Sequence, residues 1–227
     1  MAEHLLHTRV KTAKGRKKSS TAWLQRQLND PYVVRAHKEG YRGRAAYKII
    51  ELNEQFHFFK KGARVVDLGA APGGWSQVAV QKVGSTEEKP LVFGLDILPM
   101  DPIAGARLVQ MDFNDEKAPD VLKEMMQGPA DIVMSDMAAN TTGVQSLDHL
   151  RIMNLIELGY DFAIQVLNQG GWFIAKIFAG GTDSDFLAKM KKDFAVVKHV
   201  KPPASRKDSV EYYVVAKGFK GRKNNAT

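Results

Sequence analysis

The sequence predicts an α/β protein with a mostly parallel sheet and helices on both of its faces. Short apolar runs rich in β-branched residues recur along the 227 residues, and stretches with helical periodicity separate most of them. The first run, residues 63–68, is short and mostly apolar, as expected of a strand that is covered on both faces. It leads through a glycine-rich turn into a helix start, an arrangement by which many folds hold a nucleoside cofactor.

The expected elements follow in chain order. Asn29-Asp30-Pro31 indicates a turn or a helix start, and apolar residues at helical spacing from Arg44 to Phe56 indicate a helix ahead of the sheet. Strands are expected at residues 63–68, 91–96, 106–111, 131–135, 171–178, 194–200 and 210–216. Helices are expected among them at residues 75–83, 118–127, 147–168 and 183–193.

Length and composition restrict the class of protein. The chain has room for one domain with appendages, and we expect a basic flexible arm over residues 1–20, one domain over 21–218 and a basic tail over 219–227. Cysteine is absent and the six histidines form no cluster, so we expect no metal site and favour a reducing, cytoplasmic location. No apolar run approaches the roughly 18 to 20 residues that span a bilayer, so no membrane association is expected.

Charge is divided unevenly along the chain. Residues 1–48 carry 12 Lys/Arg against 3 Asp/Glu, residues 49–197 carry 13 against 20, and residues 198–227 carry 8 against 2. The net charge of +8 therefore comes from two basic ends around an acidic middle. If the ends meet in space, they favour a polyanionic partner; the alternative is that terminal lysines merely solvate the chain.

The stretch from Val65 to Val80, VVDLGAAPGGWSQVAV, is the most informative part of the chain. Glycines between Gly69 and Gly74 permit positive φ angles and a close approach of the backbone to a ligand, which would sit beside a helix N-terminus. The spacing differs from the G-x-G-x-x-G fingerprint. This turn alone does not distinguish among three interpretations: a methyl-donor site, a dinucleotide site, or a tight connection without a ligand.

Acids that close or follow the next strands favour a nucleoside ligand. Asp96 lies 23 residues after Gly73, at a strand end where a carboxylate suits ribose hydroxyls. Asp112 follows the next apolar run, where it could accept from an adenine amino group, and Asp136 ends the run that starts at residue 131. Each acid alone could be a helix N-cap, but the set exceeds what surface solvation predicts.

Several sequence blocks follow one another in order along the chain: Trp23-Leu24, Arg42–Lys48, Asp67–Ser76, Asp96–Pro102, Met134–Ala138, Lys176–Phe178 and Glu211–Tyr213. With these blocks, the chain resembles the RrmJ/FtsJ family of S-adenosylmethionine-dependent RNA ribose 2′-O-methyltransferases, and within it the enzymes that methylate a uridine of bacterial large-subunit ribosomal RNA. The resemblance covers about Ser19 to Gly218 and implies a Rossmann-like methyltransferase fold of seven strands, the last inserted antiparallel near one edge. One departure is Ala139-Asn140, where the family usually has proline before the asparagine.

The resemblance implies a catalytic tetrad of Lys48, Asp136, Lys176 and Glu211. Lys176 interrupts an apolar strand, and buried lysines are rare unless paired, so the alternative is a structural salt bridge. We expect Lys176 to accept the hydroxyl proton as a neutral amine, with Lys48 supplying a neighbouring positive charge. Asp136 would orient Lys176, and Glu211 would orient Lys48 or the acceptor ribose.

For the donor, S-adenosyl-L-methionine, the resemblance places Gly73 and Trp75 at the methionine end, Asp96 at the ribose, Asp112 at the adenine and Asp136 near the methionine amine. Tyr41 or Tyr47 could stack on an RNA base. For Tyr47, packing in the hydrophobic core is at least as good an interpretation. Phosphate contacts are expected from basic residues near Lys48 and near the other end of the chain: Arg35, Lys38, Arg42, Arg44, Lys201, Arg206 and Lys207.

The expected activity is therefore 2′-O-methylation of a uridine in 23S rRNA within the large ribosomal subunit, by a monomer. The arm, which contains Glu3, is expected to contact RNA rather than to serve as a transit peptide. Three alternatives remain: an acceptor in tRNA or another structured RNA, a ribosome-assembly factor that binds RNA and methylates it secondarily, and a small-molecule methyltransferase. The last would leave the two basic ends unexplained.

Overall fold

A computed structural model describes residues 10, 15, 17–139, 143–178 and 184–221. Three helices come first: α1 (Lys18–Leu28), α2 (Pro31–Glu39) and α3 (Ala46–Phe56). The remaining elements alternate between strand and helix for most of their length: β1 (Val65–Leu68), α4 (Gly74–Val83), β2 (Val92–Asp96), β3 (Ala106–Gln110), α5 (Ala118–Met126), β4 (Ala130–Ser135), α6 (Gln145–Val166), β5 (Leu167–Phe178), α7 (Ser184–Asp193), β6 (Phe194–Val200) and β7 (Glu211–Phe219).

The strands form one sheet in the order β3-β2-β1-β4-β5-β7-β6. β3, β2, β1, β4 and β5 pair in parallel, whereas β7 is antiparallel to both of its neighbours, β5 and β6. The expected seven-stranded, mostly parallel sheet with an inserted antiparallel strand is confirmed. The strand order reverses between β1 and β4, and such a reversal opens a crevice for ligands at the carboxyl ends of the strands.

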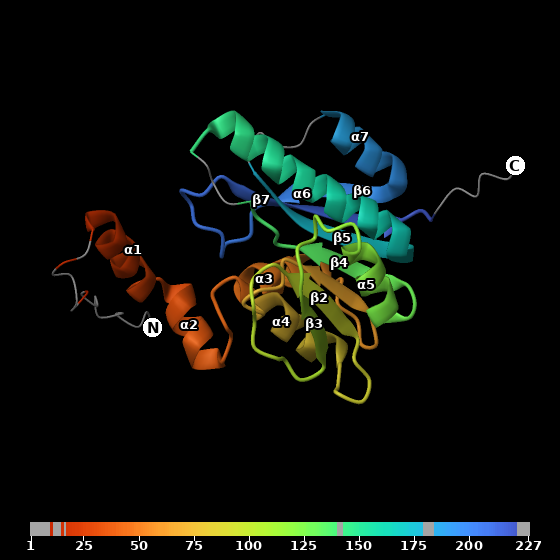
Figure 1. Ribbon diagram of the computed structural model, residues 1–227, viewed down its shortest axis with the longest axis horizontal. Coiled ribbons are helices and arrows are strands. Elements are labelled where there is room, and N and C mark those ends of the chain that lie inside the picture. Colours follow the sequence, from red (N-terminus) through yellow and green to blue (C-terminus); the bar gives the residue numbers. More distant parts are fainter. Residues whose placement is uncertain (1–9, 11–14, 16, 140–142, 179–183, 222–227) are drawn as a thin grey trace, which may run out of the picture.

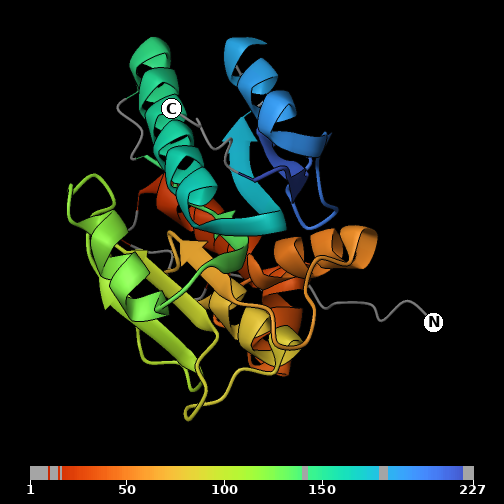
Figure 2. The same cartoon turned by 90° about the vertical axis from the view of Figure 1, so that its right-hand side faces the viewer.

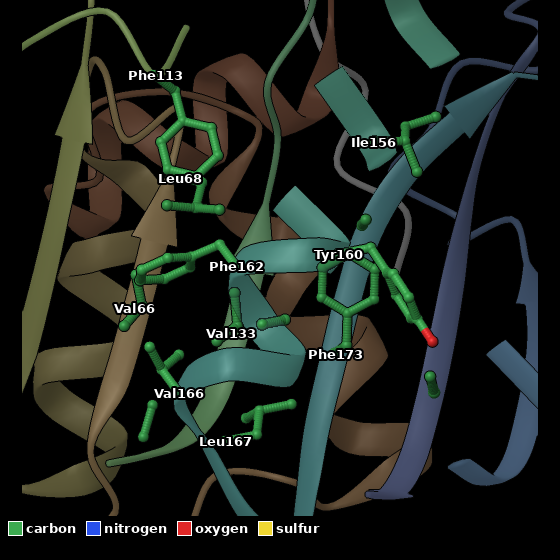
Figure 3. Packing of buried hydrophobic residues seen from close by; sticks show 14 of the residues in the cluster. Val66, Leu68, Phe113, Val133, Ile156, Tyr160, Phe162, Val166, Leu167 and Phe173 are labelled. Carbon is green, nitrogen blue, oxygen red and sulfur yellow. The ribbon is translucent and has the colours of Figure 1, made fainter. Parts of the chain in front are cut away.

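Helices cover both faces of the sheet (Figure 1). Val66 and Leu68 of β1 face the cluster that contains residues of α5, α6 and α7, and Figure 3 shows part of this packing around Tyr160 and Phe173. Val65, one residue away, faces α3 and α4 on the other side, because successive strand residues point to opposite faces. In both cartoon views α6 and α7 lie on one side of the strands (Figures 1 and 2). Among the described helices, none is both long and apolar enough to cross a membrane.

The element boundaries differ from the expected ones near the chain ends. α1 begins at Lys18, within the range expected as a flexible arm, because Ala, Leu, Gln and Arg favour helix where the basic charge had suggested disorder. Phe219 belongs to β7 rather than to a tail, since it is buried and pairs with Phe194 of β6. Residues 1–9, 11–14 and 16 of the expected arm and 222–227 of the expected tail lie outside the described residues.

The loop between β6 and β7 packs against the helices that precede the sheet. The backbone N–H of Ala204 in this loop donates to Glu51 of α3 at 2.6 Å, and the hydroxyl of Tyr32 in α2 donates to the same carboxylate at 2.8 Å. Asp30 caps α2 by accepting from the N–H of Tyr32 and also pairs with Arg44 and Arg206. Within the described residues, the part of the C-terminal basic stretch around Arg206 therefore meets the part of the N-terminal basic stretch around Arg44.

Candidate active site

A cavity of about 690 Å³ opens at the carboxyl ends of β1, β2 and β4. We call it the acidic cavity, because Asp96, Asp112 and Asp136 line it against one guanidinium, that of Arg151. Its remaining lining is backbone and apolar surface from Gly69, Ala71, Leu95, Ile97, Leu98, Phe113, Asn114, Met137, Ala138, Ala139, Leu150, Asn154 and Leu155. Ala139, the departure from the family pattern, thus adjoins the cavity, and its neighbour Asn140 lies outside the described residues.

The acids of this cavity are held by backbone donors. Asp96 accepts from the N–H of Ala71 at 2.9 Å and from the N–H of Leu98 at 2.8 Å, so its carboxylate fixes the loops after β1 and β2 to each other. Asp112 accepts from the N–H and the side-chain amide of Asn114, each at 2.9 Å. Both carboxylates keep lone pairs that can accept from hydroxyl or amino groups of a ligand.

Gly73 and Trp75 are not among the described residues that line the acidic cavity. The Trp75 ring is buried, and its indole N–H donates to the carbonyl of Ala45 at 2.8 Å. Gly73 has a φ of 110°, and a Cβ built there would lie 2.8 Å from Nη1 of Arg42. In this structure the two residues shape the loop, and a direct contact between either of them and a donor stays a prediction.

Beneath the glycine loop, Asp67 of β1 is completely buried. Its Oδ2 accepts from the hydroxyl of Ser76 in α4 at 2.6 Å, whereas its Oδ1 has no hydrogen-bond partner among the described residues. Burial raises the pKa of this carboxyl to about 7, and the negative charges of Asp136 and Asp96 add to the increase. The hydrogen bond from Ser76 lowers the pKa but does not outweigh burial. The sequence predicted a strand covered on both faces at residues 63–68, and the structure places the Asp67 side chain in that buried strand.

The four residues of the expected tetrad lie together as two ion pairs. Nζ of Lys176 is 2.9 Å from Oδ1 of Asp136 and donates to the backbone carbonyl of the same residue at 2.8 Å. Lys48 pairs with Glu211 through its Nζ and Oε1 atoms. Lys176 and Lys48 are both largely buried, with side-chain exposures of 9% and 12%.

Local structure explains why the four side chains converge. Asp136 follows β4, where its N–H donates to the carbonyl of Leu68 at 3.0 Å. Lys176 of β5 lies opposite Tyr213 of β7. Its neighbours Ala175 and Ile177 face the helix layer of α5, α6 and α7, so the Lys176 side chain points to the opposite face of the sheet, toward α3. Lys48 comes from the first turn of α3, and Glu211 begins β7.

Tyr213 joins the two ion pairs, a contact that sequence reasoning missed. Its buried hydroxyl is 3.0 Å from Oδ1 of Asp136 and 3.1 Å from Oε1 of Glu211, and its single proton can serve either carboxylate. Burial raises the pKa of the hydroxyl well above its usual value, and the charges of both carboxylates add to the increase. The alternation of residues 211 and 213 on one strand face was the signal that could have revealed it.

A second pocket, of about 370 Å³, lies on the other side of Lys48 and Glu211. We call it the basic pocket, because its lining includes four cationic side chains and two carboxylates: Arg26, Arg44, Lys48, Arg206, Asp208 and Glu211. Asp30 holds two of the cations, with Oδ2 at 3.2 Å from Arg44 Nε and 3.5 Å from Arg206 Nη2. Arg26 of α1 was not expected here, since α1 was not foreseen.

The seven residues that were expected to contact phosphates do not lie together in the structure. Arg44 and Arg206 line the basic pocket, and Lys201 ties the loop after β6 by donating to the carbonyls of Lys207 and Ser209. Arg35, Lys38 and Lys207 are exposed, with Arg35 paired to Glu39 at 2.7 Å. The guanidinium of Arg42 instead binds backbone carbonyls near the glycine loop.

The two tyrosines expected as possible stacking platforms differ in exposure. Tyr47 is buried and donates to Glu39 at 3.0 Å, so its ring is not available for a base. Tyr41 is half-buried and contacts Gln81 through its hydroxyl at 3.3 Å. No group of three or more His, Cys, Asp or Glu that could hold a metal ion occurs within the described part of the chain.

Comparison with known proteins identifies the family. Residues 41–219 match the family model described as FtsJ-like methyltransferase. The chain belongs to this family. Among curated proteins it is similar to the ribosomal RNA large subunit methyltransferase E of Paramagnetospirillum magneticum, with 60% identity over 95% of this chain and 89% of that protein. The protein of the same name from Azorhizobium caulinodans is 57% identical over 95% of this chain and 90% of its own length.

A solved structure agrees with this assignment. A Plasmodium falciparum protein provisionally described as a ribosomal RNA methyltransferase superposes with a TM-score of 0.69 at 32% identity, covering 80% of this chain and 100% of that one. In this FtsJ-like methyltransferase, the acidic cavity and the basic pocket meet at the ion pairs. Asp136 lines the first, Lys48 and Glu211 line the second, and the hydroxyl of Tyr213 contacts both carboxylates.

Proposed function

We propose that this FtsJ-like methyltransferase transfers a methyl group from S-adenosyl-L-methionine to the ribose 2′-hydroxyl of a uridine in 23S rRNA of the large ribosomal subunit. The observation that carries the proposal is the meeting of two oppositely charged pockets at one cluster of lysines and carboxylates. A cationic donor suits the acidic cavity, and a polyanionic acceptor suits the basic pocket. The names of the relatives support the large-subunit ribosomal RNA as acceptor.

The donor would occupy the acidic cavity. Asp96 at the end of β2 is the ribose ligand, Asp112 accepts from the adenine amino group, and Asp136 lies near the methionine amine and the sulfonium. Gly73 and Trp75 act at the methionine end by shaping the loop around it. The cavity residues of this chain thus bind and orient the donor, and the donor supplies the methyl group.

The reaction is an in-line displacement. The acceptor oxygen forms a bond to the methyl carbon while the carbon–sulfur bond breaks, and the sulfonium becomes a neutral thioether. The hydroxyl proton passes to Lys176, which enters this step as the neutral amine. Lys48 supplies a neighbouring positive charge, and Asp136 orients the Lys176 side chain through the contact at 2.9 Å.

Alignment supplies much of the remaining rate enhancement. Fixing two reactants in a reactive geometry can provide about 7 to 11 kcal/mol. Glu211 holds Lys48 in place, and Tyr213 fixes the distance between Glu211 and Asp136 by contacting both. Lys48 can then hold the ribose hydroxyl or an adjacent phosphate at the mouth of the basic pocket.

The acceptor would be gripped from both ends of the chain. Arg44 and Arg206 bind phosphates in the basic pocket, Arg35, Lys38, Lys201 and Lys207 extend the positive surface around it, and the N-terminal arm adds further contacts. We propose that the shape of the rRNA within the subunit supplies the specificity. We propose that the protein acts as a monomer, in the cytoplasm where the subunits are assembled.

The test is transfer of labelled methyl from S-adenosylmethionine to large ribosomal subunits from a strain that lacks the gene. Free rRNA, tRNA, a Lys176→Ala enzyme and a Lys82→Ala enzyme, altered at an exposed lysine of α4, are assayed in parallel. Label in 2′-O-methyluridine of the subunits that disappears only with Lys176→Ala supports the proposal. Label on tRNA alone would replace the acceptor, and donor binding without any transfer would favour an assembly factor.

A further inference from the structure

The guanidinium of Arg42 joins two loops beside the acidic cavity. Its Nη1 donates to the carbonyls of Pro72 at 3.1 Å and Asp101 at 2.7 Å, and its Nη2 donates to the carbonyl of Pro102 at 2.7 Å. Pro72 lies in the loop after β1, whereas Asp101 and Pro102 lie in the loop after β2. Hydrogen bonds from a charged donor are stronger than those between neutral groups, so these three bonds hold the loops together.

The packing of Arg42 also explains the glycine at position 73. A Cβ there would lie 2.8 Å from Nη1 and 3.2 Å from Cδ of Arg42, and 2.7 Å from Cδ1 of Ile103. A larger residue would displace the guanidinium or the loop after β2. The positive φ of 110° at Gly73 adds a second reason for glycine, and neither reason involves a ligand.

The backbone around Arg42 is fixed to α4, the helix that follows the glycine loop. The N–H of Arg42 donates to Oε1 of Gln77 at 2.8 Å, and Nε2 of Gln77 donates to the carbonyl of Gly40 at 3.1 Å. The indole of Trp75 donates to the carbonyl of Ala45. Residues 40–45 are thus attached to the start of α4, and α3, which carries Lys48 in its first turn, begins at Ala46.

We infer that Arg42 is a positioning residue of the donor site rather than a phosphate contact. It holds the loops after β1 and β2 in the arrangement that forms the acidic cavity, and its backbone anchors these loops to the segment that leads to Lys48. A donor that binds the ordered loops therefore also meets a correctly placed Lys48. This inference rests on S-adenosylmethionine as the donor, as proposed above.

The experiment compares Arg42→Gln and Arg42→Lys with Arg107→Gln, a change at an exposed arginine of β3 outside both pockets. Calorimetry without RNA gives the dissociation constant for S-adenosylmethionine, thermal unfolding monitors the fold, and RNA binding is measured against salt concentration. Arg42→Gln should weaken donor binding about tenfold. Without the guanidinium, fewer molecules have both loops in the binding arrangement, and the apparent affinity for the donor falls in proportion to that fraction. Arg42→Lys, which can replace part of the hydrogen bonding, should fall between Arg42→Gln and wild type.

The outcomes separate this inference from the proposed function. Arg107→Gln should bind the donor as wild type does, and the salt dependence of RNA binding should be the same in all four proteins. The inference would be overturned if Arg42→Gln bound the donor as wild type does and if the slope of log RNA affinity against log salt concentration fell by about one in magnitude. Arg42 would then be a phosphate contact. Failure of the wild-type protein itself to bind S-adenosylmethionine would instead refute the proposed donor.

Discussion

Replacing Asp67 by asparagine should make the protein more stable at neutral and alkaline pH. The side chain is completely buried beneath the glycine loop, with one oxygen bonded to Ser76 and the other without a partner among the described residues. Asparagine has nearly the same shape and can still accept from Ser76, but it never has to be ionised in the interior. The change therefore isolates the cost of a buried negative charge.

The size of the effect follows from the pKa of Asp67, which burial raises from 3.8 to about 7. Below pH 3.8 the carboxyl is protonated in the folded and unfolded states, and its ionisation costs no stability. Between pH 3.8 and 7 the unfolded chain loses this proton first, so stability falls as pH rises, by roughly 1.4 kcal/mol per pH unit. Above pH 7 the loss stays constant at about 4 kcal/mol, the product of roughly three units and this slope.

Urea unfolding of wild type and Asp67→Asn between pH 5 and 8.5 measures this loss. The free energy of unfolding of the variant, minus that of wild type, should rise by about 3 kcal/mol between pH 5 and 8 and then level off. Asp120→Asn, at a carboxylate whose side chain is 83% exposed, should show no such rise. A difference that stays constant with pH would show that Asp67 has an ordinary pKa, and the account of its burial would be wrong.

Three further changes test the site. Lys176→Ala should lower kcat by a factor of about 10² to 10⁴, which is the usual contribution of a general base, and should leave donor binding unchanged. A kcat near that of wild type would show that Lys176 is not the base. Tyr213→Phe removes the hydroxyl between Asp136 and Glu211 and should lower the free energy of unfolding by about 2 kcal/mol, measured in urea, together with kcat. Lys207→Ala should weaken RNA binding and reduce its salt slope by about one at unchanged donor affinity; an unaltered slope would place Lys207 outside the RNA contact.

The central parallel strands β1, β2 and β4 could be predicted because each is encoded locally. Their apolar runs, which are buried on both faces, stand out in the sequence, and the turn after β1, the acid that ends β2 and the acid after β4 mark their carboxyl ends. The boundaries were less certain where two signals compete. At α1 the basic residues obscured a helix that begins at Lys18, and at the start of β5 the expected helix extended to residue 168, whereas α6 ends at Val166.

The site could be predicted only in part, because its remaining contacts join residues distant in the chain. Nothing near Asp30 in the sequence indicates that its carboxylate pairs with Arg206. The glycine at position 73 was interpreted as room for a ligand, whereas the nearest polar atom belongs to Arg42, another long-range neighbour. Such pairings depend on how helices pack on the sheet, which local periodicity does not encode.

The position of β7 inside the sheet affects when the enzyme becomes competent during synthesis. The acidic cavity is lined by residues 69–155, so its parts emerge from the ribosome before β7 does. In the described sheet β6 is an edge strand whose neighbour is β7, and the basic pocket needs Arg206 and Glu211. At roughly 5–20 residues per second, a nascent chain would carry the elements of the proposed donor site for several seconds before it could grip the proposed RNA acceptor. Translation itself would thus delay methyl transfer until the two distant segments of the polypeptide have met.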